Sequence, residues 1–92
     1  MTRGRFDRDR LPSSPTYFTS IGMKLVGRGA WRTAVCPFHN DTRPSLRVHF
    51  MEGAFKCMAC GAHGGDILAF HQQRTGVGFT QAARELGAWV MR

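Results

Sequence analysis

Apolar and polar side chains alternate along one short segment, where Leu46, Val48 and Phe50 are separated by Arg47 and His49. A period of two residues is typical of a strand with one buried face. We therefore expect the three apolar residues to point into a core. The arginine and the histidine are expected to share the polar face of the strand.

Two more strands are predicted around this one. Residues 24–35 contain a glycine-rich turn between apolar segments and predict a hairpin, with 30–35 as its alternating second strand. Glu52 and Gly53 form a turn signal, so residues 54–57 are expected to pair back as a third strand. The central part of the chain thus predicts an antiparallel sheet.

Helices are predicted on both sides of the strands. Ser14 precedes a proline and is expected to cap a short helix that ends at Gly22. Asp66 is expected to cap a second helix, and Thr80 a third helix that ends at Gly87. Together with the strands, these helices predict a small α+β fold.

Composition divides the 92 residues into three parts. Residues 1–14 predict a flexible basic arm, 15–88 a single small domain and 89–92 a short tail. No segment approaches the ~18 apolar residues of a membrane span, and the arginine-rich start is unlike a signal peptide. We therefore expect a cytoplasmic protein without a membrane partner.

The chain is strongly basic, with 13 Lys and Arg against 6 Asp and Glu, for a formal net charge of +7. Residues 1–35 carry seven of the basic and two of the acidic groups, so most of the excess lies there. A positive balance of this size favours a polyanionic partner, with nucleic acid as the first candidate.

The most specific chemical signal is a pair of short metal-ligand motifs. Cys36 and His39 are separated by two residues, as are Cys57 and Cys60. Such spacing lets both side chains of a pair reach one ion from a tight turn, and three thiolates with one imidazole favour a tetrahedral zinc site. The predicted hairpin between the pairs brings them together in the manner of a zinc ribbon.

The fourth ligand has alternatives. His63 and His49 also lie near the cysteines in sequence, although only His39 completes a pair with Cys36. Four protein ligands would close the coordination sphere, so we expect one structural Zn²⁺ and no hydrolytic zinc enzyme.

The segments CPFHNDTRPSLRV, starting at Cys36, and FKCMACGAHGGDILAF, starting at Phe55, carry a family resemblance. Over roughly residues 15–88 the chain resembles the N-terminal zinc-binding domain of bacterial and phage DnaG-type DNA primases. The resemblance implies a zinc ribbon, an antiparallel β-sheet with flanking short helices. The metal ligands that it implies are Cys36, His39, Cys57 and Cys60.

The same resemblance implies a role in recognising the single-stranded template for primer synthesis. In the family, synthesis belongs to a separate polymerase domain, and the sequence ends at Arg92 without one. We therefore expect no enzyme activity from the isolated chain, and a primase polymerase domain or a replicative helicase as further partners. An adaptor that docks on a replication or transcription protein without binding DNA is the alternative.

Single-stranded DNA is held by basic side chains along its backbone and by aromatic rings against its bases. The candidate contacts are Lys24, Arg28, Arg32, Arg43, Arg47 and Lys56, with Trp31 as a stacking platform. Phe50 and Phe55 are further candidate platforms, and core packing is the competing expectation for Trp31 and Phe50. Because Trp31 and Arg32 are adjacent in a strand, only one of them can face a given ligand.

Overall fold

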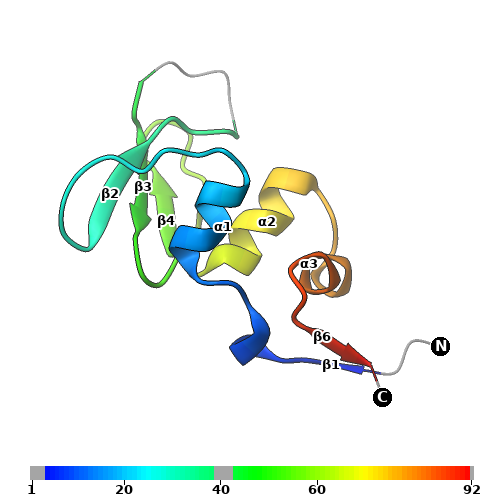
Figure 1. Ribbon diagram of the computed structural model, residues 1–92. Coiled ribbons are helices and arrows are strands. Elements are labelled where there is room, and N and C mark those ends of the chain that lie inside the picture. Colours follow the sequence, from blue (N-terminus) through cyan, green and yellow to red (C-terminus); the bar gives the residue numbers. More distant parts are fainter. Residues whose placement is uncertain (1–3, 39–42, 92) are drawn as a thin grey trace.

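The computed structural model describes residues 4–38 and 43–91, which form a four-stranded sheet, a two-stranded ribbon and three α-helices between them (Figure 1). The described elements in chain order are β1 (Gly4–Phe6), the 3-10 helix η1 (Arg8–Arg10), α1 (Ser14–Ser20), β2 (Trp31–Ala34), β3 (Leu46–His49), β4 (Phe55–Cys57), β5 (His63–Gly64), α2 (Ile67–Thr75), α3 (Phe79–Glu85) and β6 (Trp89–Met91). The predicted α+β zinc-ribbon architecture is confirmed.

The four-stranded sheet is antiparallel throughout, in the order β2-β3-β4-β5. Leu46 lies opposite Ala34 on one side and Cys57 on the other, while Val48 lies opposite Phe55. All five side chains are buried. The alternation therefore predicted the buried face of β3 correctly for Leu46 and Val48, whereas Phe50 follows the end of the strand and is only half-buried.

Aromatic rings fill the space between the sheet and its helices. The ring of Phe70, on α2, lies 4.9 Å from that of Phe18, 4.9 Å from that of Phe55 and 5.0 Å from that of Phe38, measured between centroids. Tilted and edge-to-face contacts at these distances are favourable beyond the area they bury. This cluster fixes α1 and α2 against the strands that carry the cysteines.

One of the three helix caps was predicted at the correct residue, and the other two were predicted one or two residues away. Asp66 caps α2, its Oδ1 accepting the Ala69 N–H at 2.9 Å. The cap of α1 is Ser13 rather than Ser14, and α3 begins after Gly78 without a side-chain cap instead of at Thr80. The first displacement is one residue, because Ser13 carries the same hydroxyl as Ser14, and the second is two residues, from Thr80 to Gly78.

The predicted hairpin over 24–35 is mostly a loop. Only Val26 and Thr33 pair, exchanging backbone hydrogen bonds of 2.8 and 2.9 Å. Gly27 and Gly29 both have positive φ, which shapes the connection as an irregular loop. The regular partner of β2 is β3, and Trp31 is 51 % exposed rather than packed in the core.

The two ends of the described chain pair with each other. Gly4 lies opposite Met91 and Phe6 opposite Trp89 in a two-stranded ribbon. The sequence predicted a flexible arm and a short tail for these residues. Phe6 also contacts Phe79 edge-on, with ring centroids 5.2 Å apart. A contact between segments this distant along the chain leaves no local sequence pattern. Within the described residues, no helix is long and apolar enough to cross a membrane.

Candidate metal centre and outer sheet face

Three cysteine side chains meet at one end of the four-stranded sheet. Cys36 follows β2, Cys57 ends β4, and Cys60 lies in the turn between β4 and β5. Their sulfur atoms all lie within 4.8 Å of one another, and the Sγ atoms of Cys36 and Cys60 are 3.8 Å apart. The sheet pairing therefore brings Cys36 of the first predicted motif together with both cysteines of the second.

The surroundings of Cys57 lower the pKa of its thiol. Burial opposes the charge, but hydrogen bonds from the Cys60 backbone N–H, the Ser45 hydroxyl and the Ala59 N–H outweigh it and lower the pKa of Cys57 to about 6. The Cys60 N–H lies 3.4 Å and the Ser45 Oγ 3.6 Å from the Cys57 Sγ. Ser45 was not singled out from the sequence, and only its place one residue before β3, beside the end of β4, indicates the contact.

The Cys36 thiol is harder to ionise than that of Cys57 when no cation is bound. Burial, together with the neighbouring sulfur atoms, raises the pKa of Cys36 to about 12, although the Phe38 N–H donates to its Sγ at 3.4 Å. A divalent cation would remove this penalty by supplying positive charge among the thiolates. The electrostatics of the cluster thus fit a bound metal.

The spacing of the cluster fits zinc. Sulfur ligands at about 2.3 Å from a tetrahedral Zn²⁺ lie about 3.8 Å from each other, which matches the distance between Cys36 and Cys60. Thiolate-rich sites also favour Zn²⁺ over harder ions. The predicted fourth ligand, His39, lies outside the described residues, and neither His49 nor His63 belongs to the cluster.

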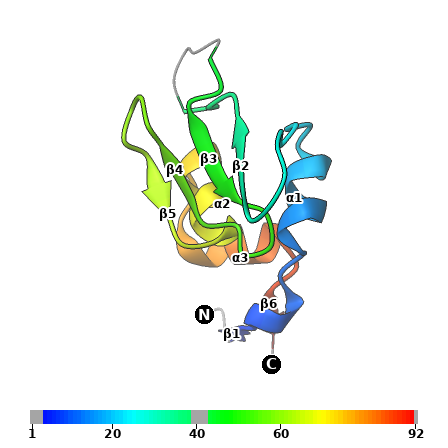
Figure 2. The same ribbon diagram turned by 90° about the vertical axis from the view of Figure 1, so that its left-hand side faces the viewer.

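Within residues 4–38 and 43–91, no helix covers the face of the four-stranded sheet that points away from α2. Figure 2 shows α2 and α3 behind the strands, with no helix in front of them. We call this surface the outer face, and the strand pairing places six side chains on it: Trp31, Thr33, Arg47, His49, Lys56 and His63. None of these six residues is acidic.

Three predicted nucleic-acid contacts therefore share one surface. Trp31, Arg47 and Lys56 are all exposed on the outer face, and a shallow hollow of about 100 Å³ is lined by Trp31, Thr33 and Arg47 together with Arg32. Thr33 and His63 were missed from the sequence, Thr33 because it is uncharged. His63 was missed as a face residue because the two-residue strand β5 has no visible alternation.

The other candidate contacts lie elsewhere. Arg32 projects from the opposite side of β2, where its guanidinium carbon lies 3.6 Å from the centroid of the Phe50 ring. Phe55 is buried in the core and offers no surface for stacking. Arg28 and Arg43 are exposed in loops beside β2 and β3.

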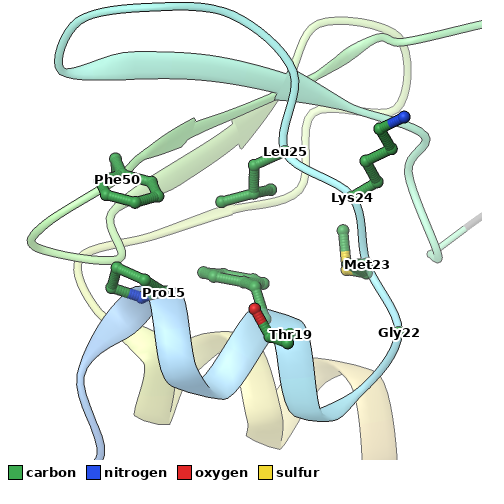
Figure 3. A pocket seen from close by; sticks show the side chains of 8 residues that line it. Pro15, Thr19, Gly22, Met23, Lys24, Leu25 and Phe50 are labelled. Carbon is green, nitrogen blue, oxygen red and sulfur yellow. The ribbon is translucent and has the colours of Figure 1, made fainter.

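Lys24 lies at the rim of an apolar groove of about 460 Å³. Figure 3 shows Pro15 of α1, Leu25 and Phe50 around this groove, with the Lys24 amino group pointing away from Phe50. The seven predicted contacts thus do not form one surface.

Similarity to known proteins also indicates a zinc site in this chain. Residues 19–91 match the family model described as CHC2 zinc finger. The chain is 40 % identical over 64 residues to the DNA primase of Thermotoga maritima and 43 % identical over 58 residues to that of Chlamydia pneumoniae. These alignments cover 70 % and 63 % of the chain, but only 11 % and 10 % of the primases.

A phage relative is shorter. The chain is 37 % identical over 54 residues to the Gene 58 protein of Mycobacterium phage D29, covering 59 % of the chain and 41 % of that protein. The family match extends over most of the sequence and includes all three clustered cysteines. The chain therefore belongs to the CHC2 zinc finger family, as a zinc-binding domain of the DnaG primase type with a structural zinc site.

Proposed function

We propose that the outer face binds the single-stranded template on which primers are made. The observation that carries this proposal is the grouping of exposed Trp31 with Arg47 and Lys56 on one uncovered, acid-free sheet face. Basic groups can follow the phosphates while an indole ring stacks on a base, which is the usual way of holding single strands. The primase names of the relatives support DNA as the ligand.

We further propose that Cys36, His39, Cys57 and Cys60 are the four ligands of the structural Zn²⁺. The cysteines sit at the ends of β2 and β4, which flank β3. A metal bound there would fasten both neighbours of β3 and so keep Trp31, Arg47 and Lys56 in register. Zinc would supply strong ligand bonds at this corner, and the residues of the sheet would make the contacts with DNA.

The salt dependence of oligonucleotide binding tests the proposal. The slope of log affinity against log salt is about −0.7 per phosphate neutralised on a single strand. Arg47→Gln and Lys56→Gln should each make the slope shallower by about 0.7. Arg84→Gln, on α3 away from the outer face, is the matched control and should leave it unchanged.

Trp31→Ala should weaken binding by about 1–3 kcal/mol through loss of one stacked base, with little change in the salt slope. Failure of the zinc-loaded protein to bind any oligonucleotide at low salt would overturn the proposal. A ribonucleotide incorporation assay completes the test, because we expect the isolated chain to bind template without extending a primer.

An adaptor role is the second candidate, and the apolar groove beside Lys24 favours it. A groove of this kind suits a side chain from a primase polymerase domain, a replicative helicase or a transcription protein. Leu25→Glu would place a charge in the groove. If this variant loses a protein partner in a pull-down while oligonucleotide binding persists, the groove is a separate docking site.

A further inference from the structure

On the outer face, His49 and His63 each form a hydrogen bond between Nδ1 and a backbone atom. In His49 this nitrogen accepts, and in His63 it donates. The Nδ1 atom of His49 lies 3.1 Å from the Glu52 backbone N–H and accepts from it. The Nδ1 atom of His63 lies 3.0 Å from the Gly61 carbonyl oxygen. Because a carbonyl oxygen can only accept, His63 must donate from a protonated Nδ1.

When an imidazole is neutral, a contact of this kind determines which of its two nitrogens carries the proton. The accepting Nδ1 of His49 leaves its proton on Nε2, so that atom is a hydrogen-bond donor. The donating Nδ1 of His63 leaves Nε2 bare, so that atom is an acceptor. Two side chains of the same type therefore present opposite hydrogen-bonding groups on one surface.

The positions of the two rings suit the proposed path of a single strand. His49 lies opposite Trp31, with the rings edge-on at 89° and their centroids 5.2 Å apart. His63 lies opposite Lys56, whose other neighbour across the sheet is Arg47. Lys56, on β4, thus lies between the strands of the two histidines, and Arg47 lies two residues before His49 on β3.

One base cannot reach both histidines. They are separated by two strand spacings of ~4.8 Å and by two residues along the strand, which corresponds to about 12 Å. The backbone near His63 is also held in place, since the Gln73 side chain of α2 donates to the His63 carbonyl at 2.8 Å. Two different bases of a bound strand would be needed to contact the pair.

From this arrangement we propose that His49 and His63 read two different unpaired bases through fixed, opposite tautomers. This inference rests on the proposed function. The Nε2–H of His49 donates to a carbonyl oxygen, which guanine, cytosine and thymine carry and adenine lacks, on the base that stacks near Trp31. The bare Nε2 of His63 accepts from an exocyclic amino group, which adenine, cytosine and guanine carry and thymine lacks. In a single strand the Watson–Crick edges of the bases are unpaired and open to such contacts.

The tautomers can be observed directly, without DNA. Nitrogen-15 NMR of the zinc-loaded protein at pH 8 distinguishes an Nε2–H imidazole from an Nδ1–H imidazole. We expect His49 to show the first form and His63 the second. The same tautomer at both positions would overturn the inference, whatever the protein binds.

Binding to oligonucleotides with one varied position tests the reading itself. His49→Phe keeps an aromatic ring but removes the donor, so the preference for carbonyl-bearing bases near Trp31 should fall about fivefold, the effect of one hydrogen bond. His63→Phe should reduce the preference for amino-bearing bases at a second position by a similar factor. Zinc content and circular dichroism would verify that both variants fold.

Lys56→Gln is the matched control, because losing a phosphate contact should weaken binding to all sequences alike. If the wild-type protein binds single strands but both histidine variants keep its base preference, the reading role is wrong and the proposed function stands. If the wild-type protein binds no single strand, both proposals are wrong.

Discussion

At the residue scale, the turn between β3 and β4 depends on Gly53. Its φ is +80°, and a Cβ atom built there would lie 2.7 Å from the Ile67 Cγ2 and 3.0 Å from the Ile67 backbone nitrogen. Ile67 is buried at the start of α2. The turn between β3 and β4 therefore needs a residue with a positive φ and also packs closely against α2. Glycine meets both requirements because it has no Cβ atom.

Replacing Gly53 with alanine should therefore lower the free energy of unfolding for two separable reasons. Gly22→Ala is the matched control, because Gly22 has a similar φ of +77° but no atom within 4 Å of the added Cβ. The control should lose about 1–2 kcal/mol from left-handed backbone strain alone. Gly53→Ala should lose a further ~1–3 kcal/mol from overpacking against Ile67. Equal losses in chemical denaturation would show that the contact with α2 is unimportant.

At the element scale, the sequence predicted the elements whose signals are local. Alternation identified β3, and a side-chain cap marked the start of α2, because each signal lies within the element itself. The two-residue strand β5 is too short to alternate, and the pairing of β1 with β6 joins the two ends of the chain. The cysteines were predictable from spacing, whereas the makeup of the outer face required the register between strands.

A chain of hydrogen bonds joins the three α-helices. Arg74 donates to the Tyr17 hydroxyl, which donates to the His71 Nδ1 at 2.9 Å, and the His71 Nε2–H donates to Glu85 at 2.7 Å. Tyr17 and His71 are buried, with His71 only 7 % exposed. The sequence indicated that His71 lies on the apolar side of its helix, but not which polar partners it meets there.

This network predicts a specific acid sensitivity. The hydrogen bond from His71, with a second from Gln81, lowers the pKa of Glu85 below its ordinary value near 4.5. A carboxyl group with a lowered pKa stabilises the fold above its ordinary pKa, and this contribution is lost as the pH falls through the lowered value. In urea titrations, Glu85→Gln should be less stable than the wild type at pH 6. The difference should shrink progressively below pH 4.5.

Acid also releases zinc from thiolates, which lowers the stability of both proteins. The informative quantity is therefore the difference between wild type and Glu85→Gln at each pH. A difference that stays constant from pH 6 to pH 3 would contradict a contribution from the charged carboxylate.

At the scale of the whole molecule, charge is distributed differently from what the bulk composition suggests. Two arginines near the N-terminus lie beside acids: Arg8 is 2.9 Å from Asp66 and Arg10 is 3.5 Å from Asp7. Such exposed pairs contribute little stability, but they reduce the positive field of this end. Under the proposed function, the basic groups that would contact DNA are Arg47 and Lys56, which lie on the outer face of the sheet whose end carries the cysteine cluster.

Removing the metal should test how the whole molecule is held together. Four short strands and a small aromatic core give a domain of this size only a marginal surplus of buried surface, while structural zinc supplies about 10–16 kcal/mol of apparent binding free energy in small zinc domains. A strong chelator should therefore abolish the sheet and helix signals in circular dichroism together, and added Zn²⁺ should restore both. Cys57→Ser should behave like the chelated protein. If the spectrum persists after the zinc is gone, the aromatic cluster around Phe70 folds the sheet unaided, and the metal serves only to position the cysteine loops at its end.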